Sequence, residues 1–282
     1  MGTSQSVQTS VHTLAERIAR CDTVLPMLPS VAMRVIELAA DPDVHVAQLA
    51  RIVTKDQVLA SRLLGLANSA FAAPSSPVTT LTQAMVRLGT GRVRNLVLTV
   101  SFHSKLCDER TYGPNGRRLM DHGVGTAYLA RLAAERARVD VDEAFLCGLV
   151  HDIGKLVVYK IAYDIQREGG AGVDPAELDL FVVERHAEIG ARVLSGWQLP
   201  ASLQQPVLYH HDYRAAPAAR RETAVLYLAN ILSHRYGFGC DRREDDPLLD
   251  GVCEELGIDA TWLADTDTHA PGLFEIALQA LQ

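Results

Sequence analysis

Apolar residues recur every three to four positions along most of the chain, and sustained alternation of apolar and polar residues is almost absent. This spacing places apolar side chains along one face of an α-helix. Leu59, Leu63, Leu66 and Ala67, for example, form one such stripe. The pattern predicts an all-α protein with helices near residues 30–40, 46–54, 56–68, 81–88, 93–107, 118–137, 142–151, 154–165, 175–194, 202–211 and 223–236, followed by short helices.

Helix-breaking residues divide this series of helices into two lobes. Residues 108–117 are polar and contain Gly113, Pro114 and Gly116. Glycine and proline are the residues that most often interrupt helices, so we place a lobe boundary in this stretch. The predicted organisation is an N-terminal helix or tail over residues 1–24, a helical lobe over 25–112 and a second helical lobe over 113–282.

The composition narrows the class of protein. The chain of 282 residues is 48% apolar and 22% charged, which suffices for a hydrophobic core and excludes a disordered protein. Its 27 Lys and Arg residues and 34 Asp and Glu residues give a net charge of −7. Because binding to a nucleic acid relies on a basic surface, we predict no nucleic-acid partner.

Cysteines and apolar runs indicate where the protein resides. The five cysteines lack C-x-x-C spacing, and their scatter is typical of reduced thiols in the cytoplasm. The polar N-terminus contains no secretory signal. The uncharged run over residues 63–86 contains Pro74, Pro77 and several amide and hydroxyl side chains, which would leave polar groups unsatisfied in lipid. We expect a cytoplasmic protein without membrane contact.

Two segments of the first lobe allow a binding role beside a structural one. Residues 49–68 have the length of a DNA-binding helix-turn-helix, but Arg62 is the single basic residue of the second helix. Three arginines surround Gly89-Thr90-Gly91, a pattern that can bind an anion at the start of a helix. A core segment and a plain helix connection are the more frequent uses of such patterns.

An adjacent histidine and aspartate in the second lobe form the most informative pattern for chemistry. His151 and Asp152 end a predicted helix, so a nitrogen and an oxygen donor point into the same space, and Lys155 is near enough to reach an anion bound there. Imidazole and carboxylate together suit first-row metals such as zinc, iron, manganese and cobalt. Two such ions that share a carboxylate are suited to the attack on a phosphoester.

Other histidines occupy helices of the same lobe. His122 and His186 lie on predicted amphipathic helices, and His210 and His211 end another. Consecutive helical positions are about 100° apart, so His210 and His211 can both face one pocket only if the helix ends there. The remaining histidines fit no common pattern and are expected to be structural: His12, His45, His103, His234 and His269.

The segment around His151 resembles the signature of the HD superfamily, which is named for a metal-binding His-Asp pair; it reads LCGLVHDIGKLVV over Leu146–Val158. The first lobe resembles the HDOD family, the HD-related output domain of bacterial signalling proteins. Its matching segments are LPMLPSVAMRVIELAADPDV (Leu25–Val44), TKDQVLASRLLGLANSAF (Thr54–Phe71) and PVTTLTQAMVRLGTGRVRNLVLT (Pro77–Thr99), and in the second lobe ERHAEIGARVLSGWQLP (Glu184–Pro200) and YHH (Tyr209–His211). The number and order of these segments make the resemblance specific.

The resemblance implies a metal site that holds one or two ions of iron, zinc or manganese. Its ligands, position by position, are His122, His151, Asp152, His186, His210, His211 and Asn230. The superfamily usually has an aspartate at the last position, in an L-A-D segment that reads Leu228-Ala229-Asn230 here. Asparagine keeps the shape and one oxygen ligand but loses the negative charge, so it is the weaker ligand.

Two further departures concern the related HD-GYP phosphodiesterases. These proteins have a D-G-x-G-Y-P run after the paired histidines, where this chain has Asp212–Pro217, which reads DYRAAP. Their trinuclear members have a glutamate one turn before the first histidine, where this chain has Arg118. Both departures argue against a third metal ion and against hydrolysis of cyclic dinucleotides.

By resemblance, the chain is predicted to be a regulatory module of signal transduction with a partly eroded metal site. It would act through contact with a signalling protein partner or through a conformational change and would not be an enzyme, and a homodimer is left open. The alternative hypothesis is a metal-dependent phosphohydrolase of nucleotides or phosphomonoesters. In this alternative Asp152 bridges two ions, and Lys155 stabilises the charge that develops on the phosphate, so both residues are catalytic.

Overall fold

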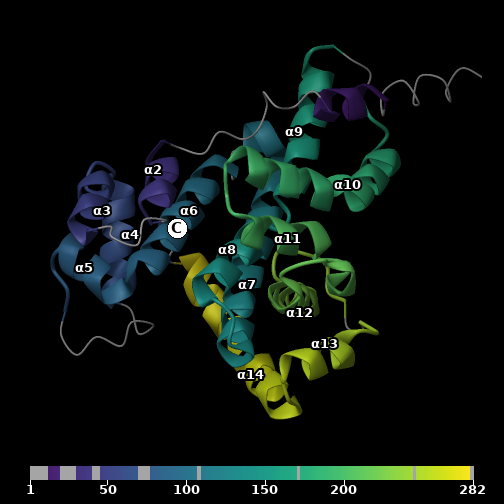
Figure 1. The fold of residues 1–282 in the computed structure, drawn as a ribbon. Helices are drawn as coiled ribbons and strands as arrows, with labels where there is room; N and C mark the ends of the chain where they lie inside the picture. The colour runs from purple at the N-terminus through teal and green to yellow at the C-terminus, as the bar shows by residue number, and fades with distance from the viewer. Residues whose placement is uncertain are drawn as a thin grey trace, which may run out of the picture. The chain divides into compact units, whose positions relative to one another are not determined.

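The computed structural model describes residues 12–19, 30–39, 45–68, 77–106, 109–169, 172–243 and 246–279. All regular secondary structure in these ranges is helical, which confirms the predicted all-α fold class (Figure 1). Of the predicted N-terminal helix or tail, residues 12–19 are described and helical, and the rest lies outside the described residues. The helices that follow are α2 (Ser30–Ala39), α3 (Val46–Val53), α4 (Gln57–Asn68), α5 (Leu81–Leu88), α6 (Thr90–Leu106), α7 (Glu109–Ala137), α8 (Val141–Val150), α9 (Ile153–Arg167), α10 (Pro175–Gly196), α11 (Ala201–Tyr209), the 3-10 helix η3 (Tyr213–Ala215), α12 (Arg220–Tyr236), α13 (Leu249–Leu256) and α14 (Ala260–Gln279).

The chain divides into two compact units, which we describe separately. Unit 1 comprises residues 1–27 and 106–271, and unit 2 comprises residues 28–105 and 272–282. In unit 2, α3 packs against α2, α4 and α5. Leu49, Leu63 and Met85 are fully buried in its core. The lobe boundary placed after residue 112 from the sequence stays a prediction.

Unit 1 contains the long helix α7, which packs most extensively against α8 and α12. A second group forms where α10 packs against α9 and α11. Ala127, Ala130 and Ala134 are buried on α7, and such small side chains let neighbouring helices approach closely. All predicted ligand positions lie on these helices or directly at their ends.

The start of α7 differs from the sequence prediction. The pattern predicts that this helix begins near residue 118, after the polar stretch, but this start is wrong because α7 is helical from Glu109 onward. Pro114 lies near the start of the helix, and its backbone nitrogen has no hydrogen to donate. The N–H groups of the first turn also lack an intrahelical acceptor, so the proline removes only one further hydrogen bond from this end of the helix. The buried turns from Met120 onward then stabilise the helix.

The C-terminal region also differs from the sequence prediction. Where the pattern predicts only short helices, α14 is 20 residues long and contains Pro271 in its interior. A proline in a helix interior removes a hydrogen bond and usually ends the helix, so the local pattern favours shorter elements.

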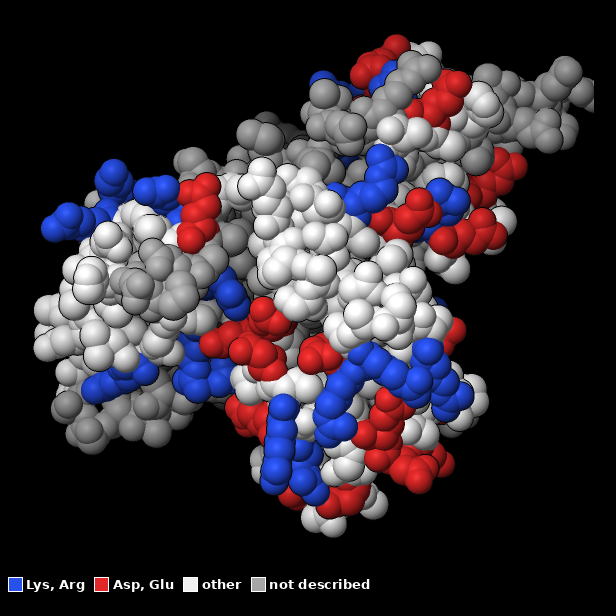
Figure 2. Space-filling view, in the orientation of Figure 1, with Lys and Arg blue, Asp and Glu red and all other residues white. Residues whose placement is uncertain are grey.

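The surface of unit 1 has mixed charge. Lys and Arg side chains lie beside Asp and Glu side chains across the face shown in Figure 2. Unit 1 also contains ion pairs such as Arg220 with Glu255 and Arg136 with Asp259. The absence of a nucleic-acid partner stays a prediction from the sequence. Among the described helices, none combines the length and apolar character needed to cross a membrane.

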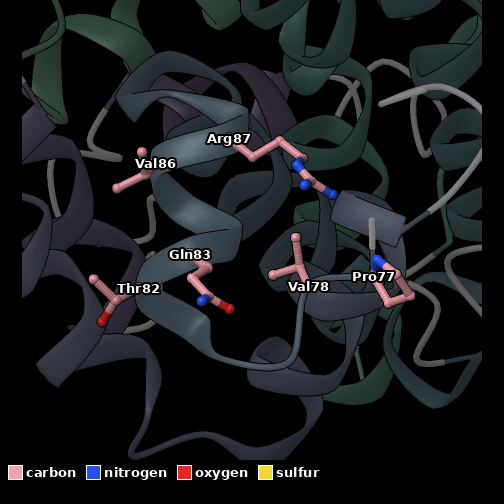
Figure 3. A pocket seen from close by; sticks show the side chains of 6 residues that line it. All are labelled: Pro77, Val78, Thr82, Gln83, Val86 and Arg87. Atoms are coloured by element: carbon pink, nitrogen blue, oxygen red, sulfur yellow. The ribbon is translucent and has the colours of Figure 1, made fainter. Parts of the chain in front are cut away.

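Unit 2 contains a shallow cavity of about 440 Å³. Its wall comes from α5 and the segment that leads into it (Figure 3): Pro77, Val78, Thr82, Gln83, Val86 and Arg87. The lining is mainly apolar, and Arg87 is its one ionisable residue among those that line it. The cavity therefore lacks the paired acid, base or metal-ligating groups that chemistry requires.

Candidate metal centre

The His151-Asp152 pair occupies the short junction between α8 and α9. α8 ends at Val150, His151 follows as its C-cap, and α9 begins directly after Asp152. Seven consecutive residues of α8, Ala144–Val150, are buried, so the junction is held inside the bundle. The His151 side chain is fully buried, and the Asp152 side chain is 6% exposed. The ordinary alternation of helix and turn thus places a carboxylate and an imidazole in the interior.

Gly154 allows α10 to approach this junction and brings His186 toward Asp152. A Cβ atom at Gly154 would lie 2.0 Å from the backbone oxygen of His186 and 2.8 Å from the backbone nitrogen of Gly190. Both neighbours are backbone atoms and cannot rotate away. Packing therefore explains why the Asp-Ile-Gly segment after His151 ends in glycine, since any residue with a side chain at position 154 would separate α9 from α10.

Replacing Gly154 by alanine is expected to lower the free energy of unfolding by about 3 kcal/mol or more, because overpacking against backbone atoms forces the two helices apart. Urea unfolding followed by circular dichroism measures this loss. The control is Gly65→Ala on α4, where no atom lies within 4 Å of the added Cβ, and where alanine should stabilise the helix slightly. Equal stability of the two variants would show that α9 and α10 can separate at little cost.

His210 and His211 both reach the cluster because α11 ends before them. The helix ends at Tyr209, and His210 is its C-cap. The Nε2 atom of His186 lies 3.3 Å from Nε2 of His210 and 2.9 Å from Nε2 of His211. Both rings can therefore face one pocket, as the sequence analysis required, because the helix ends at this point.

His122 and Asn230 complete the cluster from α7 and α12. The Nδ1 atom of His122 lies 3.1 Å from the Phe238 carbonyl oxygen and 3.1 Å from the Ser233 hydroxyl oxygen. Its Nε2 atom lies 3.1 Å from Oδ1 of Asn230. Gly239 has a φ of +64°, and a Cβ there would lie 2.4 Å from the His122 backbone nitrogen, so only glycine lets this loop approach α7.

Four of the imidazole rings are oriented in the same way, with Nδ1 against a backbone carbonyl oxygen. The pairs are His122 with Phe238 (3.1 Å), His151 with Gly148 (2.8 Å), His186 with Val182 (2.7 Å) and His210 with Val207 (2.7 Å). A neutral imidazole that donates its proton from Nδ1 has a free lone pair on Nε2. These backbone contacts therefore favour the tautomer that a metal ion requires, as in known metal sites.

The four Nε2 atoms surround the carboxylate of Asp152. Their distances to its nearer oxygen are 3.7 Å for His122, 3.4 Å for His151, 3.4 Å for His186 and 3.8 Å for His210. The Nζ atom of Lys155 lies 2.7 Å from Oδ2 of the same carboxylate. Asp152 is thus the common centre of the cluster.

The cluster contains more acceptors than donors. Within the described part of the chain, Oδ1 of Asp152 and Nε2 of His151 are buried without a hydrogen-bond partner. With Nδ1 as the donor in both rings, no hydrogen lies between Nε2 of His186 and Nε2 of His210. Unpartnered acceptors in a buried site are costly unless a cation joins them, so this donor set fits a metal ion.

Burial lowers the pKa of several imidazoles of the cluster. Burial lowers the pKa of His122 to about 3, and burial together with His186 lowers that of His211 to about 4. Burial and the neighbouring His211 hold the pKa of His210 well below its usual range. Burial alone would raise the pKa of Asp152, but His151 and the Lys155 ammonium group lower it well below its usual value. The site therefore combines the neutral imidazoles of His122, His210 and His211 with one carboxylate anion, the form that binds a divalent cation.

The ligand atoms form two groups that could each hold a metal ion. One consists of His186, His210 and His211, and the other of His122, His151 and Asp152; within each group the ligand atoms lie within 4.8 Å of one another. Because Oδ1 of Asp152 faces the first group and Oδ2 faces the second, this side chain connects them. The structure thus brings all seven predicted ligand positions and Lys155 into one cluster.

The sequence interpretation left one residue aside that lies at this cluster. His234, expected to be an ordinary structural histidine, has its ring centroid 5.0 Å from that of His122. It also lines a cavity of about 200 Å³ that adjoins the cluster. His234 follows Asn230 by four residues on α12, and this one-turn spacing is the signal that could have identified it.

Comparisons with known proteins agree with this description. The family model of the HDOD domain matches residues 25–213. An uncharacterised protein of Treponema pallidum is 29% identical over 226 residues, which are 75% of this chain and 42% of that protein. A ribonuclease Y of Pseudothermotoga lettingae is 28% identical over 146 residues, 45% of this chain and 24% of that protein. The chain spans less than half the length of these curated relatives.

Solved structures share the fold over nearly the whole chain. A candidate metal-dependent phosphohydrolase from Shewanella amazonensis has a TM-score of 0.76 at 19% identity and covers 99% of this chain and 100% of that chain. An HDOD domain protein of unknown function from Geobacter sulfurreducens has a TM-score of 0.72 at 24% identity, with coverage of 97% and 99%. At these identities the likeness establishes the helical fold.

Proposed function

The chain belongs to the HDOD domain family, and from this premise we propose that it is a metal-binding regulatory module of signal transduction. In this proposal the histidine–aspartate cluster of unit 1 holds one or two divalent ions of iron, zinc or manganese. The ions would stabilise one arrangement of α7 to α12, and that arrangement would be recognised by a signalling protein partner. The regulatory part of the proposal rests on the family.

One observation supports the metal site above all others. In four imidazole rings Nδ1 lies against a backbone carbonyl oxygen, and this contact favours the tautomer that leaves Nε2 unprotonated toward the buried carboxylate. A purely structural polar cluster would instead pair donors with acceptors. The acceptor excess, which includes the unpartnered Oδ1 of Asp152, favours a cation in the centre.

The position of Asn230 supports regulation over catalysis. Its amide occupies the place where an aspartate is usual in the wider HD superfamily, and it contributes no negative charge. A metal centre with a single carboxylate and neutral imidazoles retains a higher positive charge. It would therefore attract an anionic ligand, and without the usual aspartate it has one carboxylate fewer to accept a proton from a bound water molecule.

A metal-dependent phosphohydrolase is the second candidate function, and Lys155 favours it. Its ammonium group contacts Asp152 and is partly exposed, so it can reach a phosphate at the centre. Bound metal would supply Lewis acidity toward a phosphoryl oxygen. In this alternative Asp152 orients the centre and Lys155 stabilises negative charge on the phosphate, while Asn230 lowers the activity.

The metal content of the purified protein tests both functions. Protein purified without added metal, and protein stripped and reconstituted with iron, zinc or manganese, is expected to contain close to one or two ions per chain by elemental analysis. A panel of phosphomonoesters and nucleotides then separates regulation from catalysis. Stoichiometric metal without turnover supports the regulatory module, turnover supports the hydrolase, and absence of bound metal contradicts both.

Replacing Asn230 by aspartate is expected to tighten metal binding by about tenfold or more, because a carboxylate replaces a neutral oxygen ligand. The metal-free variant should be less stable than the wild type, since a second buried anion then lies near Asp152. Thermal unfolding with and without metal measures both effects. Unchanged affinity together with unchanged stability of the metal-free form would place residue 230 outside the centre.

A further inference from the structure

The cavity beside the cluster has a second wall that the metal site does not use. His210, His211 and Asn230 form the side shared with the cluster. The other side consists of Tyr227, Ile231, His234, Arg243 and Asp246, from α12 and the segment that follows it. The Arg243 backbone N–H donates to the His234 carbonyl oxygen at 3.2 Å, which attaches this segment to the end of α12.

Arg243 is the cation of this wall. In the described part of the chain it forms no ion pair, and it lies close enough to His234 and Cys240 to influence the pKa of both side chains. Guanidinium groups bind phosphate and carboxylate through two parallel N–H bonds, and this geometry distinguishes arginine from lysine. The cavity lining thus contains a cation in addition to the ligand residues of the cluster.

Asp246 is the anion of the wall, but its charge is partly compensated. Oδ1 of Asp246 accepts hydrogen bonds from the Tyr227 hydroxyl at 3.0 Å and from the Leu248 backbone N–H at 2.9 Å. These bonds hold the carboxylate in place against α12. Divalent ions at the cluster would add positive charge beside the same cavity, so an anion in the cavity would be attracted both by the ions and by Arg243.

We infer that this cavity binds a small oxyanion, inorganic phosphate or the phosphate group of a small monoester, which Arg243 contacts directly. The inference rests on the proposed metal site and names its ligand. The volume of about 200 Å³ is below the range of roughly 300–1,000 Å³ that is typical of pockets for larger ligands. A phosphate with a few further atoms fits inside, whereas a dinucleotide does not.

Phosphate binding to the metal-loaded protein, measured by isothermal titration calorimetry, tests the inference. Arg243→Ala is expected to weaken binding by about tenfold or more, as the loss of a charge-assisted hydrogen bond implies, and Arg243→Lys should restore only part of the affinity. The matched control is Arg242→Ala, which removes the same charge from the preceding residue. Arg242 does not line the cavity, so this variant should change the affinity for phosphate less than about twofold. Asp246→Asn should tighten binding several-fold by removing the repelling charge.

Elemental analysis of the same samples separates the two proposals. If metal is bound but Arg243→Ala and Arg242→Ala weaken phosphate binding equally, the inference is overturned and the metal site stands. If wild-type protein binds no metal, the proposed function fails and the inference falls with it. p-Nitrophenyl phosphate then identifies the source of the ligand: turnover that Arg243→Ala reduces shows a substrate, and binding without turnover shows a sensed ligand.

Discussion

Protein in which Asp152 is replaced by alanine is expected to fold but to bind divalent metal at least about 100-fold more weakly than the wild type. Among the residues that the structure describes, Asp152 is the one carboxylate within reach of both groups of histidines, and its two oxygens face different groups. Its loss removes the negative charge that offsets the ions and disconnects the two groups. Competition with a coloured chelator measures the affinity, and elemental analysis measures the stoichiometry.

Asp164→Ala provides a matched control. Asp164 also forms an Asp–Lys pair within one turn of helix, with Lys160 on α9, but at the surface of the bundle. Its replacement should leave metal binding unchanged, because exposed pairs of this kind contribute little. Wild-type affinity in Asp152→Ala would show that Asp152 only neutralises Lys155 and that the imidazoles face one another without a metal.

The helical fold could be predicted from the sequence because most helices bury one continuous apolar stripe. The stripe of α4 and the Asp174-Pro175 start of α10 needed no tertiary information: Asp174 accepts hydrogen bonds from the backbone N–H groups of Ala176 and Glu177, and Pro175 follows it. The start of α7 at Glu109 could not be predicted, because rules for glycine and proline describe local preference. Packing of the following turns overrides that preference.

The members of the site could also be predicted, but their chemical state could not. The motif around His151 and the order of the other histidines indicated which residues meet. The tautomers depend on carbonyl groups such as those of Val182 and Phe238, whose directions only the fold determines. The cavity wall depends on the segment after α12, where Gly237 and Gly239 adopt positive φ angles, and no pattern of apolar residues reports such a turn.

Acidification of the metal-free protein is expected to lower its stability steeply below about pH 6.5. An unfolded histidine binds a proton below that pH, whereas His122, with a folded-state pKa of about 3, does not. The unfolded state therefore binds more protons, and stability falls as pH falls through the window from 6.5 toward 3. The lowered pKa of Asp152 acts in the same direction, but only below its unfolded value of 3.8, outside most of this window.

The size of the acid effect follows from the two fully buried rings. His122 contributes about 2 kcal/mol of lost stability at pH 5, a considerable part of the stability of a typical domain, and His210, whose pKa burial also holds well below its usual range, adds to this loss. Urea unfolding of chelator-treated protein between pH 7.5 and pH 5 measures the slope of stability against pH.

At pH 7 the rings of His122 and His210 are already neutral, so metal binding should release few protons from them. Calorimetry in buffers of different ionisation enthalpy measures the number of protons released. Stability that is constant from pH 7 to pH 5 would mean that the folded cluster takes up protons in place of metal ions, and the carbonyl-fixed tautomers would then not describe the protein.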